Sequence, residues 1–334
     1  TDINLSESGT DRVLTINNTG AVTVAGTIAN GGGSTASSLT KAGTGILTLA
    51  GTNTYTGLTT IAAGTLSIAT DANLGGSGAI RLGSTTSTGT LLYTGDTDAA
   101  ISRDLNLAGT TGGGTLTNNG TASLSLSGTA SASAGSAKNL TLSGTSTGAN
   151  LYSGIISNGS GTVAVVKSGT GTWEISGTNT YTGNTTLSAG TLVAGNNSAF
   201  GTGTLLFSTS ATLAGDGTPR TLANDLRLDG SAAIGGASDL SFSGLLTQNN
   251  GNTTLTISNS GATTFGSIEI TNGALNRILT LNTSGGDVVA SGVIADGGTS
   301  TASGLAKSGA GLLTLSGINT FTGNVTLSAG TLRA

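Results

Sequence analysis

The side chains best able to do chemistry in this sequence are carboxylates that fall into two groups. Retaining and inverting glycosidases act through two carboxylates held at a fixed separation, so clustered acidic residues are the first candidates for catalysis. One group lies beside an arginine, and the other occupies the corresponding region of a second long repeat: Asp96, Asp98, Asp104 and Arg103, then Asp216 and Asp225. If the repeats stack on one another, the two groups come to lie on one side of the molecule.

Composition argues against chemistry at these groups. The chain of 334 residues contains no His and no Cys, so it cannot build a Ser-His-Asp triad, a Cys-His dyad, a His-ligated zinc site or a disulfide from its own residues. Asp96 and Asp98 could hold calcium only weakly, because the Gly-Gly-x-Gly-x-Asp calcium-binding nonapeptide is absent. We therefore predict a chain that is not an enzyme, with no catalytic residue, no metal ligand and no cofactor.

Charge is sparse and scattered along the chain. Charged residues make up 8% of it, against about 25% in an ordinary globular domain, and the net charge is −4. The eleven Lys and Arg residues form no cluster, whereas a nucleic-acid surface needs a basic stripe to neutralise phosphates. No run of about 18 apolar residues is present. These observations predict no nucleic-acid partner and no transmembrane segment.

One long pattern occurs three times, at residues 41–66, 167–192 and 307–332, and half of its positions are identical in all three copies. The copies begin at Lys41, Lys167 and Lys307, so the second interval is somewhat longer than the first. We infer repeat units of approximately 12–138, 139–277 and 278–334, the third incomplete, within one continuous solenoid over residues 1–334.

Two further segments recur outside this triplicated pattern. Upstream of each copy lies a shared hexapeptide that begins and ends with glycine: Gly26–Gly31, Gly154–Gly159 and Gly292–Gly297. Between the copies, an Asp-Leu-x-Leu frame occurs at Asp104–Leu107 and again at Asp225–Leu228. Each long unit therefore has a well-matched half and a more variable half.

Short runs of alternating apolar and polar residues predict an all-β fold. Alternation with period two places every second side chain on one face, which is typical of a half-buried strand. Glycine-rich corners separate the runs, and strands this short bury enough apolar surface only when similar coils stack into a solenoid. The runs include Ile46–Leu49, Thr65–Ile68, Ala79–Leu82, Ser123–Leu126, Leu140–Leu142 and Thr172–Ile175.

The motif Lys-x-Gly-x-Gly-x-Leu-x-Leu-x-Gly-x-Asn-Thr-Tyr-Thr-Gly, followed by Ala-Gly-Thr-Leu, resembles the passenger-associated transport repeat of bacterial autotransporters. The match departs where Trp173 replaces leucine and Phe321 replaces tyrosine. The resemblance implies a rod-like, right-handed parallel β-helix. It also implies an extracellular or outer-membrane-attached location on the surface of a bacterium.

The repeated positions are expected to be structural. We predict that the lysines are solvated charges at strand starts, and that the asparagines close their own turns through bonds to backbone. We predict that the aromatic residues pack locally rather than form platforms for sugars. The positions are Lys41, Gly43, Gly45, Gly51, Asn53, Tyr55, Gly57, Gly64, Lys167, Gly169, Gly171, Gly177, Asn179, Tyr181, Gly183, Gly190, Lys307, Gly309, Gly311, Gly317, Asn319, Phe321, Gly323 and Gly330.

These features favour a structural stalk or adhesin segment that mediates display, adhesion or cell-cell contact. The alternative is a segment of a self-assembling extracellular β-solenoid fibre. A β-helix that binds polysaccharide or ice ranks lower because the Thr-rich stretch at residues 52–56 recurs once per long unit rather than once per coil. A β-helix that degrades polysaccharide ranks last. Candidate partners are neighbouring solenoid segments, identical chains, and host-cell, bacterial-cell or matrix surfaces.

The N-terminus has neither the basic region nor the apolar region of a signal peptide. We therefore expect the chain to be a mature or excised piece of a longer protein.

Overall fold

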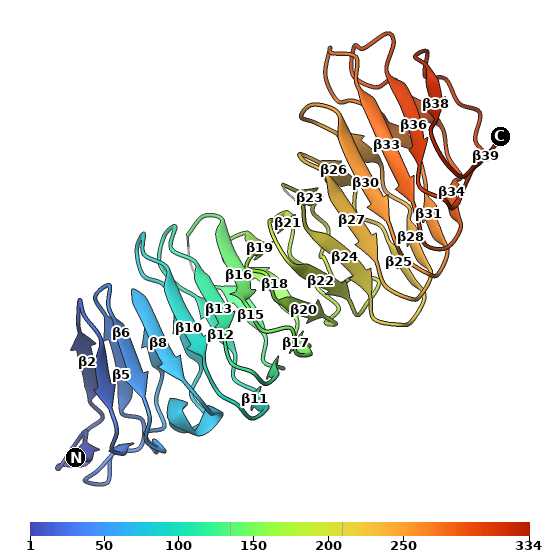
Figure 1. Ribbon diagram of the computed structural model, residues 1–334. Coiled ribbons are helices and arrows are strands. Elements are labelled where there is room, and N and C mark those ends of the chain that lie inside the picture. Colours follow the sequence, from blue (N-terminus) through green and yellow to red (C-terminus); the bar gives the residue numbers. More distant parts are fainter. Residues whose placement is uncertain (134, 209) are drawn as a thin grey trace. The chain divides into compact units, whose positions relative to one another are not determined.

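The computed structural model describes residues 1–133, 135–208 and 210–334, which divide into two compact units. Unit 1 comprises Thr1–Trp173 and Asn179–Thr182, and unit 2 comprises Glu174–Thr178 and Gly183–Ala334. In each unit, short strands stack in parallel, one coil of the chain upon the next (Figure 1). The expected all-β parallel solenoid is therefore confirmed, whereas the limits of the three repeat units stay a prediction.

The strands of unit 1 form stacks in which each strand pairs with those before and after it in the order given. The β3–β19 stack contains β3 (Val22–Val24), β6 (Ile46–Leu49), β8 (Gly64–Ile68), β10 (Gly89–Tyr93), β13 (Gly114–Asn118), β16 (Lys138–Gly144) and β19 (Val163–Lys167). The β2–β18 stack contains β2 (Val13–Asn17), β5 (Ser38–Ala42), β7 (Thr59–Ile61), β9 (Ile80–Leu82), β12 (Leu105–Leu107), β15 (Ala130–Ala132) and β18 (Ile156–Gly159). A shorter stack contains β11 (Ala99–Ile101), β14 (Leu124–Leu126) and β17 (Asn150–Tyr152), and β1 (Ile3–Asn4) pairs with β4 (Ile28–Ala29).

Unit 2 is built in the same way. The β21–β35 stack contains β21 (Thr185–Leu187), β23 (Leu205–Phe207), β26 (Leu226–Leu228), β29 (Leu246–Gln248), β32 (Ile268–Glu269) and β35 (Ile294–Ala295). The β22–β38 stack contains β22 (Thr191–Ala194), β24 (Thr212–Gly215), β27 (Ala232–Gly235), β30 (Thr253–Ile257), β33 (Ile278–Thr283), β36 (Gly304–Ser308) and β38 (Val325–Leu327). The β25–β39 stack contains β25 (Arg220–Leu222), β28 (Leu240–Phe242), β31 (Thr263–Phe265), β34 (Val288–Ala290), β37 (Leu312–Leu315) and β39 (Thr331–Arg333). The division between the units falls within β20 (Thr172–Ile175).

Register between neighbouring strands gives the length of a coil. Gly64 pairs with Gly89 and Gly89 with Gly114. One coil in this region therefore contains the residues from one of these glycines up to the next. In unit 2, Leu226 pairs with Leu246, so the coil is shorter at that point. The difference arises in the turns between strands, because the strands themselves stay in register.

The core of each unit is a set of ladders in which inward side chains stack on their equivalents in the next coil. In unit 1, Leu66, Leu91, Leu116 and Leu142 are in register, and none of them is exposed. In unit 2, the rings of Phe242 and Phe265 stack with their centroids 5.3 Å apart. Each ladder buries one apolar residue per coil, which is how strands with a single apolar face form a continuous core.

Within the described part of the chain, one short helical segment interrupts the strands: a 3-10 turn, η1, at Asp71–Leu74. Thr70 and Asn73 cap its start, since Asn73 Oδ1 accepts the Thr70 N–H at 2.9 Å. Among the residues that the structure describes, no helix has the length and apolar character needed to cross a membrane.

Candidate functional site

The lysine of each repeat points into the solenoid. Lys41 is 0% exposed, and its Nζ donates to the carbonyl oxygens of Ala42 at 2.6 Å, Gly43 at 2.8 Å and Ala63 at 3.3 Å. Ala63 lies in the next coil, because Lys41 pairs with Ile61. The ammonium group therefore holds its own turn and ties it to the following coil.

The third copy repeats this arrangement in unit 2. Lys307 is 0% exposed, and its Nζ donates to Ser308 O and Gly309 O, both at 2.7 Å, and to Ala329 O at 3.1 Å. The turn depends on glycine because Gly309 has φ 74°, a left-handed conformation that side chains disfavour. The carbonyls of this turn provide the acceptors that a buried ammonium requires.

In the second copy, Lys167 is also 0% exposed, and its Nζ donates to Ser168 O at 2.8 Å and Gly169 O at 2.9 Å. Burial lowers the pKa of Lys167 to about 8. The prediction that the repeat lysines are solvated is wrong for all three copies. Each lysine falls on an inward position of its alternating strand, where the glycine turn supplies carbonyls in place of water.

The asparagine of each repeat bonds to the coil before its own. Asn53 Oδ1 accepts the Ile28 N–H at 2.8 Å, and Asn53 Nδ2 donates to Asn73 O, in the following coil, at 2.5 Å. The prediction that each asparagine closes its own turn is therefore wrong, although its partners are backbone atoms as expected. The equivalent bonds in the other copies run from Ile156 N to Asn179 Oδ1 at 2.7 Å and from Ile294 N to Asn319 Oδ1 at 2.9 Å.

The threonine after the aromatic residue makes a second bond to the same preceding coil. Asn30 Nδ2 donates to Thr56 Oγ1 at 2.8 Å, and Asn158 Nδ2 donates to Thr182 Oγ1 at 2.9 Å. In the third copy an aspartate replaces the amide, and Thr322 Oγ1 donates to Asp296 Oδ2 at 2.8 Å. These partners lie in the hexapeptides shared upstream of the repeats, so the bonds explain why those segments recur.

The aromatic position is buried in the first two copies. Tyr55 and Tyr181 are both 0% exposed, so neither ring is available as a platform for sugars. The Tyr55 hydroxyl lies 2.7 Å from Thr59 Oγ1, and burial raises the pKa of Tyr55 to about 12. In the third copy, Phe321 replaces the tyrosine and Val325 replaces the threonine four positions later. Both hydroxyl groups of this hydrogen bond are therefore absent from that copy.

We call the lysine, asparagine and threonine of each repeat, with these backbone and side-chain partners, the coil lock. Several repeat glycines accompany it because the preceding coil leaves no room for a side chain. A Cβ on Gly51 would stand 2.3 Å from Gly26 O, and a Cβ on Gly317 would stand 2.0 Å from Gly292 O. Other glycines of the motif have positive φ, namely Gly43, Gly64, Gly169, Gly190, Gly309 and Gly330.

The candidate carboxylates also hold neighbouring coils together. Asp104 Oδ1 accepts the Thr129 N–H at 2.9 Å, and Asp225 Oδ1 accepts the Leu245 N–H at 2.8 Å. Each aspartate precedes one strand and caps the strand of the next coil, which accounts for the repeated Asp-Leu-x-Leu frame. Asp98 does the same for the Ser123 N–H at 2.9 Å.

Arg103 bonds to the preceding coil and not to Asp96 or Asp98. It is 7% exposed, and its guanidinium donates to Leu74 O at 2.8 Å and Gly75 O at 2.6 Å at the end of η1. Its Nε lies 3.6 Å from Asp71 Oδ1. The arginine therefore supports the preceding coil rather than an acidic pair.

In unit 2, Asp216 is paired with an arginine. Its Oδ1 and Oδ2 accept bonds from Arg220 Nε at 3.1 Å and Nη2 at 2.5 Å, and this bonding holds the pKa of Asp216 below its ordinary value. Burial, and then the charge of Asp216, raise the pKa of nearby Glu174. Asp216 and Asp225 thus lie in unit 2, whereas the other candidate carboxylates lie in unit 1.

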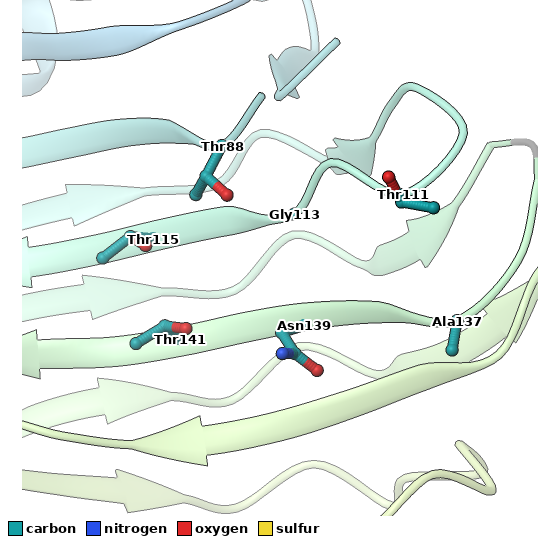
Figure 2. Close-up of a pocket in the computed structure, with 7 residues that line it drawn as sticks. All are labelled: Thr88, Thr111, Gly113, Thr115, Ala137, Asn139 and Thr141. Carbon is teal, nitrogen blue, oxygen red and sulfur yellow. The ribbon is translucent and has the colours of Figure 1, made fainter. Parts of the chain in front are cut away.

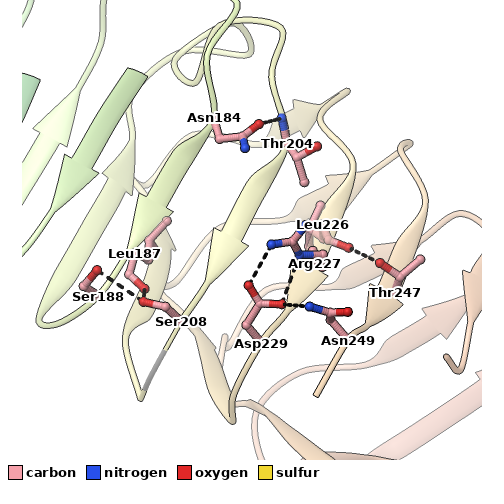
Figure 3. Close-up of polar contacts among 10 residues, drawn as sticks. All are labelled: Asn184, Leu187, Ser188, Thr204, Ser208, Leu226, Arg227, Asp229, Thr247 and Asn249. Atoms are coloured by element: carbon pink, nitrogen blue, oxygen red, sulfur yellow. Dashed lines mark hydrogen bonds and ion pairs between the residues drawn. The ribbon is translucent and has the colours of Figure 1, made fainter. Parts of the chain in front are cut away.

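A second polar cluster lies on the β21–β35 stack (Figure 3). Arg227 pairs with Asp229 through Nε at 3.0 Å and Nη2 at 2.9 Å, and Asn249 of the next coil donates to Asp229 Oδ1 at 2.9 Å. Within residues 1–133, 135–208 and 210–334, no group of three or more acidic, His or Cys side chains is placed to hold a metal ion. Many of the ionised groups that the structure describes bond to a neighbouring coil, as Lys41, Asp104 and Asp229 do.

The structure thus defines a parallel β-solenoid whose coils are joined by a recurring set of polar bonds, in which the lysine is buried and the threonine is exposed in all three copies. The lysine, asparagine and threonine of each coil lock fall within a match to the passenger-associated-transport-repeat, and the three matches cover residues 39–68, 165–194 and 305–334. The repeat resemblance is therefore confirmed, and it implies a secreted or cell-surface bacterial protein. No curated protein and no solved structure matches the chain.

Proposed function

We propose that this chain is a structural segment of an autotransporter passenger: a stalk or adhesin segment without catalytic activity that serves display, adhesion or cell-cell contact. The coil lock is the observation that carries the proposal. A segment held away from a cell must keep its shape without help from a compact globular core. The lock meets that need because each copy bonds one coil to a neighbouring coil through side chains of the repeat.

The proposed lack of catalysis is supported by what the carboxylates bind. Asp98, Asp104 and Asp225 each accept a backbone N–H of the next coil, and Asp216 is engaged by Arg220. A carboxylate held in this way has fewer free lone pairs with which to take a proton from a substrate. We expect no release of soluble sugars when the chain is incubated with polygalacturonate.

Surface display tests the proposal directly. The chain is anchored to a bacterial surface by its C-terminal end and carries a peptide epitope at its N-terminal end. Each whole coil that is removed should lower recognition of the epitope by a bulky antibody. It should also lower the attachment of the cells to host cells or to each other. The control replaces the removed coils with flexible Gly-Ser linkers of equal length.

Epitope recognition that stays constant however many coils are removed would contradict a role in display. A linker variant that displays and adheres as well as the intact chain would contradict the need for a folded stalk.

A further inference from the structure

One part of unit 1 presents a surface without charge. Between Asp104 and Lys167 the sequence contains a single charged residue, Lys138. Lys138 is 1% exposed, and its Nζ donates to Gly109 O at 2.6 Å and Thr110 O at 2.8 Å. The exposed side chains of these coils are therefore uncharged, and most of the polar ones are Thr, Ser and Asn.

The outer face of the β3–β19 stack carries a row of threonines. Thr115 and Thr141 lie in the uncharged coils, and Thr65 and Thr90 continue the row in register on the preceding strands. Their side chains therefore repeat at the strand spacing of about 4.8 Å. Among the described residues, none of these four hydroxyls has a hydrogen-bond partner in the protein. The row thus offers unpaired donors and acceptors at a regular interval.

The row borders a hollow of about 250 Å³ (Figure 2). Gly114 pairs with Leu140 and with Gly89, which places Gly113 between Asn139 on one side and Thr88 on the other. Because Gly113 has no side chain, the surface is recessed there, and Thr115 and Thr141 line the recess along the strands. Figure 2 shows Thr115 and Thr141 side by side on neighbouring strands, with Asn139 before Thr141 on the same strand.

We propose that this face binds a neutral polysaccharide, with the hollow taking one sugar and the threonine row taking its neighbours. Hydroxyl and amide groups match sugar hydroxyls, which both donate and accept. An anionic polymer would need cationic side chains, and the only one in the uncharged coils is buried. An apolar partner would strip water from the hydroxyls without replacing their bonds. The recess also makes the face a poor template for a flat ice plane.

This inference goes beyond the stalk role and does not depend on it. The threonine row was not apparent from the Thr-rich stretch at residues 52–56, because none of its members lies there. Three of them belong to Gly-Thr-Leu segments that begin at positions 64, 89 and 114, and Thr141 belongs to a Leu-Thr-Leu segment. The face repeats once per coil, which is the property that binding to an extended chain of similar sugars requires.

Affinity electrophoresis of the full chain in native gels tests the proposal with dextran, mannan and laminarin as neutral polymers and polygalacturonate as the anionic one. We expect at least one neutral polymer to retard the chain and polygalacturonate to leave it unretarded. The double variant Thr115→Val, Thr141→Val removes two hydroxyls and keeps the β-branched shape, so the affinity should fall about tenfold.

The matched control is Thr40→Val, Thr60→Val, which removes two in-register, half-buried hydroxyls from the β2–β18 stack. It should be retarded as strongly as the parent chain, and circular dichroism should show that both variants are folded. Absence of retardation by all three neutral polymers would overturn the proposal. So would retardation by polygalacturonate alone, an equal loss in both variants, or inhibition of ice growth without binding to any polysaccharide.

Discussion

The buried repeat lysines Lys41 and Lys307 depend on the coil beside them. An ammonium group taken out of water is costly unless hydrogen bonds replace its hydration. Lys41 and Lys307 each recover three bonds, of which one comes from a residue in the following coil. At the scale of the residue, the lock therefore makes the fold of one coil conditional on the presence of the next.

All four lysines of the chain should resist amine-reactive reagents in the native state. Lys41, Lys138, Lys167 and Lys307 are each at most 1% exposed. Lys167 is the most informative case because its pKa is lowered to about 8. At pH 8 a large share of its amine is therefore neutral and nucleophilic, and only burial protects it from the reagent. Mass spectrometry after brief acylation at that pH should find the α-amino group modified and the lysines unmodified.

The same reagent applied in denaturant should modify all four lysines, which controls for intrinsic reactivity. Native acylation of any repeat lysine at the rate of the denatured chain would contradict the buried lock.

The role of a residue could be predicted from the sequence only where it depends on neighbouring residues of the same strand or turn. The inward position of Lys41 follows from the alternation of its strand, but the sequence does not reveal the carbonyls that make an inward lysine tolerable. The bond from Ile28 to Asn53 links two different coils, so predicting it requires the register to be known. Tyr55 and Thr59 of the first copy are both replaced in the third copy, by Phe321 and Val325. This joint replacement could have indicated the buried hydrogen bond between the two hydroxyl groups.

At the scale of the element, the strands followed from alternation because each has a single apolar face. The run at Ile46–Leu49 coincides with β6, and the run at Ser123–Leu126 contains β14. The coil length was harder to predict, although Gly-Thr-Leu recurs at equal intervals from positions 64, 89 and 114. The turn η1 lies outside any alternation, since capping and the contacts of Arg103 determine it.

The loss of stability on replacing a corner glycine should depend on how closely the backbone of the neighbouring coil approaches it. A Cβ on Gly51 would stand 2.3 Å from Gly26 O, so we expect Gly51→Ala to lower the free energy of unfolding by about 3 kcal/mol, at the upper end of overpacking costs. Gly20→Ala is the matched control, because a Cβ there meets nothing within 4 Å. Its free energy of unfolding should stay within about 0.5 kcal/mol of the parent.

Chemical denaturation measures both variants against the parent chain. Equal losses of stability in Gly51→Ala and Gly20→Ala would show that close approach between coils is not what selects glycine at the corners.

At the scale of the whole molecule, the coil is the unit of construction within each compact unit. Register passes from coil to coil without a break along each stack of unit 2, so one coil can be removed without disturbing the register of the rest. Leu205 pairs with Leu226 and Leu226 with Leu246. Deletion of residues 226–245 would therefore let Leu246 take the place of Leu226 beside Leu205.

Spin labels can measure the effect of that deletion inside unit 2, because the chain has no cysteine and two introduced ones can be labelled uniquely. Thr191→Cys and Ser308→Cys place the labels at outward positions joined by five coil steps on the β22–β38 stack. Five steps correspond to about 24 Å and four to about 19 Å, since each coil advances by about 4.8 Å.

Pulsed electron spin resonance on the labelled chain, with and without residues 226–245, tests most directly whether the protein is a stack of interchangeable coils. Our account predicts a single narrow distance in each case, shorter by about 5 Å after the deletion, with the circular dichroism of a folded β protein retained. A broad distribution after the deletion, or a mean distance that does not shorten by one coil, would contradict it.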